Sequence, residues 1–136
     1  MIEMEQANDF LDKKNIFAVI GVSTNPDKWG FKIYDGLKSK GFMVFPVNPK
    51  YDKIKDNVCY ADLRSLPKKP NVVITVVPPK ITEKIVEQCK DLGINKVWMQ
   101  PGSESKEAIT FCENNKIKIV VNTCFILDNL TKGEIC

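Results

Sequence analysis

The loop after the first apolar run carries residue types suited to holding a phosphate. Residues 21–30 read GVSTNPDKWG. Gly21 lets the backbone approach a ligand closely, Ser23 and the following N–H groups can donate hydrogen bonds, and Lys28 adds a full positive charge. A helix expected to begin at Trp29 points its positive end at the same place. The alternative interpretation is that Ser23 and Asn25 only satisfy turn and capping hydrogen bonds.

A second loop discriminates between phosphorylated ligands. It follows the second apolar run and reads Val47-Asn48-Pro49-Lys50. Dinucleotide-binding folds that take NAD place a carboxylate here, where it accepts from the ribose hydroxyls. This loop has no carboxylate and carries a cation, which favours a ligand with a phosphate on the adenosine ribose: coenzyme A with its 3′-phosphate, or NADP with its 2′-phosphate. The alternative is a solvated Lys50 after an Asn-Pro turn.

Two further loops carry proline directly after an apolar run. Val77 is followed by Pro78 and Pro79, and Gln100 is followed by Pro101 and Gly102. Proline ends a buried strand because it has no N–H for the ladder, and this alone accounts for its place in both loops. The functional interpretation is that the prolines form a donor-free wall for an adenine or pantetheine group, with the Gln100 amide within reach of the ligand.

The composition excludes several kinds of chemistry. The chain has no histidine, so it has no Ser-His-Asp or Cys-His triad, no imidazole base and no phosphohistidine. No carboxylate pair has a spacing that suggests acid–base catalysis, and we expect no metal site. The five cysteines include no C-x-x-C pair, which favours buried reduced thiols. Cys124, just past the last apolar run, is a weaker candidate for thiol exchange with a ligand.

Charge and targeting signals favour a small-molecule ligand in the cytoplasm. The net charge of +3 is small and the basic residues form no long run, so nucleic acid is not expected as a partner. The acidic, polar N-terminal segment does not resemble a signal peptide, and no apolar stretch approaches the roughly 20 residues of a membrane span. Among 20 basic residues Arg64 is the one arginine, so phosphate has to be held by lysine and backbone N–H groups.

The loops are positioned by an alternation of apolar runs and helical stretches. Such alternation is typical of a parallel sheet covered by helices, in which ligands bind beyond the carboxyl ends of the strands. A short edge strand at Cys59-Tyr60 precedes the third long run, and Asp62–Leu66 reads as one helical turn. The expected strands are residues 16–22, 42–47, 71–77, 95–100 and 117–121, and the expected helices are residues 2–13, 29–40, 80–92 and 103–115.

These elements predict one α/β domain over residues 1–136. The expected fold is a single Rossmann-like, doubly wound, five-stranded parallel sheet of order 3-2-1-4-5, with helices on both faces. In this numbering residues 71–77 form the fourth strand, after the short edge strand. Ser103 is expected to cap the last helix, and Ile81, Ile85, Cys89 and Leu92 form the apolar stripe of the helix before it.

Four motifs in this order resemble the CoA-binding domain family. They are AVIGVSTNPDKWG, VNPK, VVPP and WMQPG. The family comprises small standalone proteins similar to the CoA-binding domain of succinyl-CoA synthetase alpha subunits and of NDP-forming acyl-CoA synthetases. The resemblance covers about residues 14–126, and it implies CoA binding at the strand ends. The matching positions are Gly21, Val22, Ser23, Lys28, Val47, Asn48, Pro49, Lys50, Val77, Pro78, Pro79, Gln100 and Gly102.

The resemblance does not imply synthetase activity. In the synthetases the catalytic histidine belongs to a further domain, and this chain has no histidine. The leading hypothesis is therefore a non-catalytic module that binds coenzyme A or acyl-CoA. The alternatives are an NADP-binding oxidoreductase or redox sensor, and the CoA-site subunit of a split acyl-CoA synthetase. A homo-oligomer and an acyl-CoA-utilising partner subunit both stay open.

Overall fold

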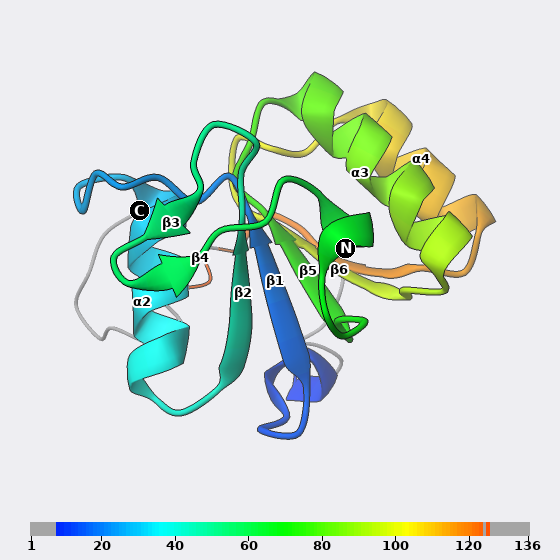
Figure 1. Cartoon of the computed structure of the whole chain (residues 1–136). Coiled ribbons are helices and arrows are strands. Elements are labelled where there is room, and N and C mark those ends of the chain that lie inside the picture. The colour runs from blue at the N-terminus through cyan, green and yellow to red at the C-terminus, as the bar shows by residue number, and fades with distance from the viewer. Residues whose placement is uncertain (1–7, 124, 126–136) are drawn as a thin grey trace.

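The computed structural model describes residues 8–123 and Phe125, and its centre is a parallel β-sheet (Figure 1). The sheet has five strands in the order β2-β1-β5-β6-β7, and every neighbouring pair is parallel. This confirms the expected Rossmann-like α/β fold. The strands are β1 (Ile16–Ile20), β2 (Met43–Val47), β5 (Val72–Thr75), β6 (Lys96–Met99) and β7 (Lys118–Val120).

The segment between β2 and β5 extends the sheet edge by one bridge. Strands β3 (Lys53–Ile54) and β4 (Asn57–Val58) form a separate antiparallel pair, and Tyr60 then makes a single parallel bridge with Val47. When residues 59–60 are counted as the third strand, the order is 3-2-1-4-5 with β7 added beyond β6. When only the five continuous strands are counted along the chain, it is 2-1-3-4-5.

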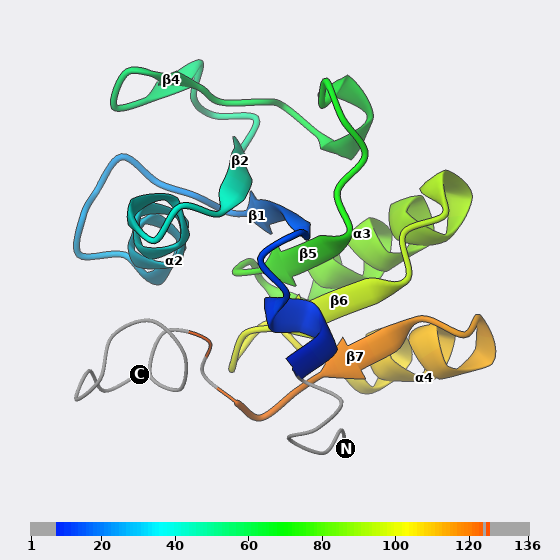
Figure 2. The same cartoon turned by 90° about the horizontal axis from the view of Figure 1, so that it is seen from below.

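Helices cover both faces of the sheet. Figure 2 shows α2 (Trp29–Ser39) on one face and α3 (Pro79–Leu92) with α4 (Lys106–Asn114) on the other. The 3₁₀ helix η1 (Asn8–Leu11) packs on the α2 side through the buried Phe10. A second 3₁₀ helix, η2 (Leu63–Ser65), precedes β5.

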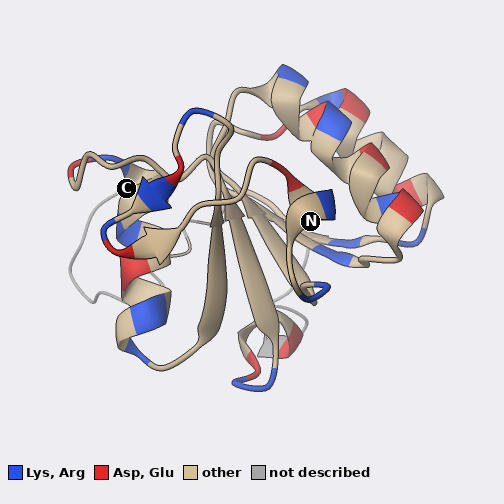
Figure 3. Ribbon diagram, viewed as in Figure 1, with Lys and Arg blue, Asp and Glu red and all other residues tan. Residues whose placement is uncertain are grey.

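Alternation along each strand builds two cores, one on each face. In β1, Phe17 and Val19 join the core under α2, whereas Ala18 and Ile20 join the core under α3 and α4. This is the period of two that a strand buried on both faces requires. The charged residues lie on helices, loops, the short strand β3 and the first residues of β6 and β7, and β1, β2 and β5 carry none (Figure 3).

Helix boundaries differ from the sequence prediction mainly at α4. Ser105, not Ser103, is its N-cap, and the Ser105 hydroxyl accepts from the Ala108 N–H at 3.0 Å. Ser103 is instead buried. In α3, Ile81 is 39% exposed and is not part of the core stripe. The described residues include η1 from the helix that was expected at residues 2–13. After residue 123 they include Phe125, which is buried.

Within the described residues, no helix combines the length and the apolar character that crossing a bilayer would require.

Candidate functional site

A cleft runs along the carboxyl ends of the strands, and we call it the strand-end cleft. It consists of three adjoining pockets of about 420, 510 and 260 Å³, here named the loop pocket, the deep pocket and the Pro-Gly pocket. The loop and deep pockets share Gly21, Asn48, Lys50 and Val76, and the deep and Pro-Gly pockets share residues 76–78. The lining comprises residues 20, 21, 23, 28–30, 47–51, 61, 62, 76–78, 81, 85, 88 and 100–103.

The structure brings the predicted site residues together from four loops, with two exceptions. Val22 is fully buried in the core under α2, and Pro79 is the first residue of α3; neither lines the cleft. The predicted residues that line it are Gly21, Ser23, Lys28, Val47, Asn48, Pro49, Lys50, Val77, Pro78, Gln100 and Gly102.

Two glycines fix the first loop against the sheet and against α2. Gly21 has φ +100°, and a Cβ there would overlap the carbonyl oxygen of Val76. A Cβ on Gly30 would in turn overlap the carbonyl oxygen of Gly21. The backbone of α2 therefore packs directly on the end of β1, as in glycine-rich nucleotide-binding turns. The role of Gly30 was missed in the sequence, although the glycine itself marks the end of the loop motif.

The N-terminus of α2 opens into the loop pocket without a side-chain cap. Its N-cap is Lys28, which makes no capping hydrogen bond, and no acidic residue lies in the first turn. Within the loop, Ser23 Oγ accepts from the Asn25 N–H at 3.0 Å, and Asn25 Oδ1 accepts from the Asp27 N–H at 2.9 Å. These are the turn hydrogen bonds of the alternative interpretation. The Ser23 hydroxyl also hydrogen-bonds to Tyr51, and it lies beside an uncapped, electropositive helix end.

Asn48 joins the first and second loops. Its Nδ2 donates to the Val22 carbonyl at 2.9 Å, and its Oδ1 accepts from the Lys50 N–H at 2.9 Å. Its backbone N–H donates to the Tyr60 carbonyl at 2.9 Å. The Asn48 amide therefore fixes the loops after β1 and β2 relative to each other, and this sets the position of the Lys50 backbone.

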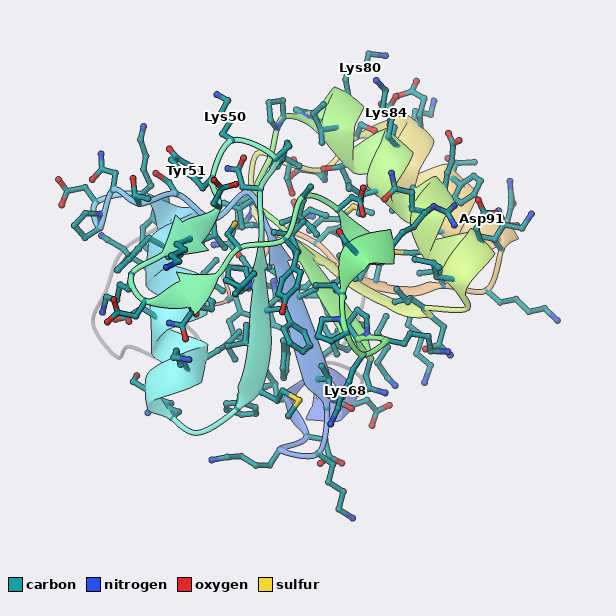
Figure 4. All side chains as sticks on the ribbon, in the orientation of Figure 1. Lys50, Tyr51, Lys68, Lys80, Lys84 and Asp91 are labelled. Atoms are coloured by element: carbon teal, nitrogen blue, oxygen red, sulfur yellow. The ribbon has the colours of Figure 1, made fainter. Side chains whose placement is uncertain are left out.

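Lys28 and Lys50 supply positive charge to the loop pocket. Within residues 8–123, neither ammonium group forms an ion pair or a hydrogen bond with another side chain. Figure 4 shows Lys50 and the neighbouring Tyr51 projecting at the end of the sheet where α3 begins. Hydrogen bonds with Ser23 and then Thr24 lower the pKa of Tyr51 from its ordinary value. Tyr51 is a lining residue that sequence reasoning missed.

The deep pocket lies between the loop after β2 and one face of α3. Val47 and Pro49 form one wall, and Ile81 and Ile85 form the other. Asp62 lines the same pocket, so a carboxylate is present near the end of β2 although the loop itself has none. Its Oδ1 accepts from both the backbone N–H and the hydroxyl of Ser65, at 3.0 and 2.8 Å.

The Pro-Gly pocket is closed by buried polar groups that are already hydrogen-bonded. Gln100 is 3% exposed, and its Oε1 accepts from the Phe125 N–H at 3.0 Å. Ser103 Oγ lies 2.9 Å from Thr75 Oγ1 and donates to the Gln100 carbonyl at 2.8 Å. The Gln100 amide oxygen therefore binds the Phe125 backbone instead of facing a ligand.

The described thiols lie outside the cleft. Cys59, Cys89 and Cys112 are buried and free, and burial is the main cause that raises the pKa of Cys89 and Cys112 to about 12. These thiols are therefore structural, as expected, whereas Cys124 and Cys136 lie outside the described residues. Among the described residues, no group of three or more Cys, Asp or Glu side chains is placed to hold a metal ion.

Comparisons with known proteins match both the sequence and the fold. ADP-forming acetate–CoA ligase II of Archaeoglobus fulgidus is 40% identical over 92 residues, which are 66% of this chain and 14% of the ligase. The alpha subunit of ADP-forming acetate–CoA ligase II of Pyrococcus furiosus is 29% identical over 127 residues, 85% of this chain and 28% of that subunit. The chain thus spans less than a third of these relatives.

A solved structure matches over nearly its whole length. It is a conserved hypothetical protein from Pyrococcus furiosus, with a TM-score of 0.78 and 40% identity, and the match covers 83% of this chain and 97% of that one. The family model described as "CoA binding domain" matches residues 15–129, which include the whole strand-end cleft. The chain therefore belongs to the CoA binding domain family.

Proposed function

We propose that this chain binds coenzyme A in the strand-end cleft, as a module without catalytic activity of its own. The observation that carries the proposal is the continuity of the cleft. The loop pocket, which is suited to phosphate, shares Gly21, Asn48, Lys50 and Val76 with the mainly apolar deep pocket, which is suited to a nucleobase. Coenzyme A has both kinds of group joined through a ribose.

The pyrophosphate would lie in the loop pocket. The uncapped N-terminus of α2 offers N–H groups and the positive end of its dipole. Lys28 lines the same pocket and has no ion-pair partner among the described residues. A charge-assisted contact of this kind contributes about 1.5–3 kcal/mol.

The adenosine would lie in the deep pocket and the pantetheine arm along the Pro-Gly pocket. This direction puts the ribose 3′-phosphate beside Lys50, which belongs to both the loop and deep pockets. The arm would then leave the loop pocket across Val76, which the loop and Pro-Gly pockets share. The family and the named relatives favour coenzyme A over NADP as the ligand.

Isothermal titration with coenzyme A and dephospho-CoA tests both the ligand and its orientation. We expect Lys50→Met to weaken CoA binding by about 10-fold or more and to leave dephospho-CoA binding almost unchanged, because dephospho-CoA lacks the 3′-phosphate. Lys28→Met should weaken both ligands by similar factors, because both carry the pyrophosphate. Lys14→Met, at an exposed lysine just before β1, is the control and should change neither affinity.

Three results would contradict the proposal or part of it. No binding of coenzyme A at millimolar concentration would refute the function itself. Tighter binding of NADP than of coenzyme A would favour the oxidoreductase alternative. Equal affinity of the wild-type protein for coenzyme A and dephospho-CoA would remove the role assigned to Lys50.

A second candidate is the CoA-site subunit of a split acyl-CoA synthetase. It is favoured by one observation: the similar Pyrococcus furiosus ligase chain is an alpha subunit. This candidate predicts that the native protein copurifies with a nucleotide-binding partner chain. Isolation of the native protein as a stable homo-oligomer alone would count against it.

A further inference from the structure

The deep pocket is lined by two charged side chains of opposite sign, Lys50 and Asp62, and its other lining residues are uncharged. Among the described residues neither of the two forms an ion pair, so the ammonium group and the carboxylate are not in contact with each other. The pocket therefore offers a ligand one cationic position and a separate anionic position.

The Asp62 carboxylate is held in place and has one oxygen left for a ligand. Asp62 is the N-cap of η2, and its Oδ1 accepts from the backbone N–H and the hydroxyl of Ser65. Its Oδ2 accepts no hydrogen bond from any residue that the structure describes. The residue is exposed and lines the deep pocket, so this carboxylate is accessible from the pocket. An ionised carboxylate only accepts hydrogen bonds, whichever oxygen faces the ligand.

Lys50 and Asp62 lie at different places along the cleft. Lys50 lines both the loop pocket and the deep pocket, whereas Asp62 lines the deep pocket alone of the three. A ligand that extends from the loop pocket into the deep pocket therefore meets Lys50 at the junction and Asp62 beyond it.

The ribose of coenzyme A would cross this junction in a defined direction. The pyrophosphate is attached through C5′, and the adenine is attached to C1′. In the sugar ring C2′ is bonded to C1′, whereas C3′ is bonded to C4′, which carries C5′. With the pyrophosphate in the loop pocket and the adenine in the deep pocket, the 3′ substituent lies on the side of Lys50. The 2′ substituent then lies on the side of Asp62.

We propose that Asp62 is a specificity-determining residue that accepts a ribose with a free 2′-hydroxyl and rejects one with a 2′-phosphate. This inference rests on the proposed function. The 2′-hydroxyl donates to Oδ2, as ribose hydroxyls do to carboxylates in other dinucleotide-binding folds, and the 3′-phosphate pairs with Lys50. A 2′-phosphate instead meets the Asp62 carboxylate, and juxtaposed like charges are strongly unfavourable. Asp62 thus separates coenzyme A from NADP, which the loop after β2 does not do by itself.

The test compares two isomeric ligands across three proteins by isothermal titration. The ligands are coenzyme A and its isomer with the ribose phosphate on C2′, which have the same atoms and the same charge. The proteins are the wild type, Asp62→Asn and Asp56→Asn. Asp62→Asn removes the charge and keeps a side chain that caps helices well, and Asp56→Asn removes an exposed carboxylate outside the cleft as the control.

The readout is the ratio of the two dissociation constants for each protein. A merely structural effect, or a change in net charge, alters both constants together and leaves the ratio as it was. We expect the wild type and Asp56→Asn to prefer coenzyme A by about 10-fold or more, because the isomer places like charges together.

In Asp62→Asn the isomer should bind about 10-fold more tightly than it does to the wild type, because the repelling charge is gone. The affinity for coenzyme A should change by less than about threefold, because the asparagine oxygen still accepts from the 2′-hydroxyl. If Asp62→Asn does not fold, Asp62→Ser replaces it, since serine also caps a helix.

The outcomes separate this inference from the proposed function. Wild-type protein that binds both isomers equally, or prefers the 2′-phosphate, would overturn the role of Asp62 and leave CoA binding intact. An unchanged ratio in Asp62→Asn, or an equal fall of the ratio in Asp56→Asn, would also overturn it. Wild-type protein that binds neither isomer would overturn the proposed function and this inference together.

Discussion

At the scale of single residues, the cleft depends on positions whose main contacts are with the chain itself. Gly21 and Gly30 let the backbones of β1, β5 and α2 approach one another, and Asn48 ties the loops after β1 and β2 together. These residues belong to the motifs that resemble the family, yet their hydrogen bonds and packing contacts are with other parts of the chain. Their contribution to a ligand site is to hold Lys50 and the first loop in place.

Gly30→Ala should destabilise the fold by about 1–3 kcal/mol, because the added Cβ overlaps the Gly21 carbonyl and backbone atoms cannot move aside cheaply. Urea unfolding followed by circular dichroism measures this change. Gly36→Ala in the middle of the same helix is the control, and it should stabilise by up to about 1 kcal/mol through helix propensity. Equal changes in the free energy of unfolding for the two substitutions would show that the close backbone approach at Gly30 does not contribute to stability.

At the scale of elements, the helices on the α3 side end as their sequences require. α3 begins with Pro79 at its first position and ends at Leu92, and the next residue, Gly93, forms the left-handed cap with φ +75°. Ser105 is the N-cap of α4, and its hydroxyl accepts from the Ala108 N–H and donates to Glu83 Oε2 at 2.8 Å. That second contact joins the N-terminal halves of α3 and α4 beside the Pro-Gly pocket.

Ser105→Ala should lower the free energy of unfolding by about 1 kcal/mol, because α4 loses its N-cap. Chemical denaturation measures the loss. Ser39→Ala, the same change at the exposed C-terminal end of α2, is the control and should stay within about 0.5 kcal/mol of wild type. A stability of Ser105→Ala equal to that of Ser39→Ala would refute the cap assignment.

At the scale of the whole molecule, the cleft exists because the chain winds in opposite senses on the two faces of the sheet. α2 follows β1 and covers one face, whereas α3 follows the adjacent β5 and covers the other. The loops after these two strands therefore diverge, and the pockets lie between them. A ligand bound there would contact elements from both cores, so we expect binding to stabilise the entire fold.

Coenzyme A at about 100 times its dissociation constant should stabilise the fold by about 2.7 kcal/mol. For a chain of this size we expect Tm to rise by about 5–15 °C, measurable by scanning calorimetry. The Lys28→Met/Lys50→Met double variant is the control, and it should show a much smaller shift at the same ligand concentration. An equal shift in both proteins would place the ligand away from the loop pocket.

The sequence predicted the elements well where local signals agree. The apolar runs located all five strands within a few residues, and Gly41 and Gly93 lie just past α2 and α3 with positive φ. Alternative caps caused the main error: Ser103 and Ser105 both precede a helical pattern, and only burial of Ser103 against Thr75 distinguishes them. Local propensity contains no information about that contact.

The candidate site was predicted unevenly for a similar reason. Residues directly after strands, such as Ser23, Asn48 and Pro78, were found because the carboxyl ends of parallel strands meet at one edge. Asp62 and Gln88 were missed because they lie outside those loops and reach the deep pocket only through the packing of the segment before η2 and of α3. Nothing in their sequence neighbourhoods distinguishes them from surface residues.

The sequence by itself determined the parallel α/β sheet, the edge of the sheet at which the cleft lies and the absence of imidazole chemistry, because these follow from period, turn residues and composition. Only the tertiary structure decided which side chains share a pocket. It joined the loop and deep pockets through Gly21, Asn48, Lys50 and Val76, directed the Gln100 oxygen to Phe125, and left the Gln88 oxygen without a partner. The reason is physical: local sequence sets backbone conformation, whereas burial and hydrogen-bond partners depend on segments that are distant along the chain.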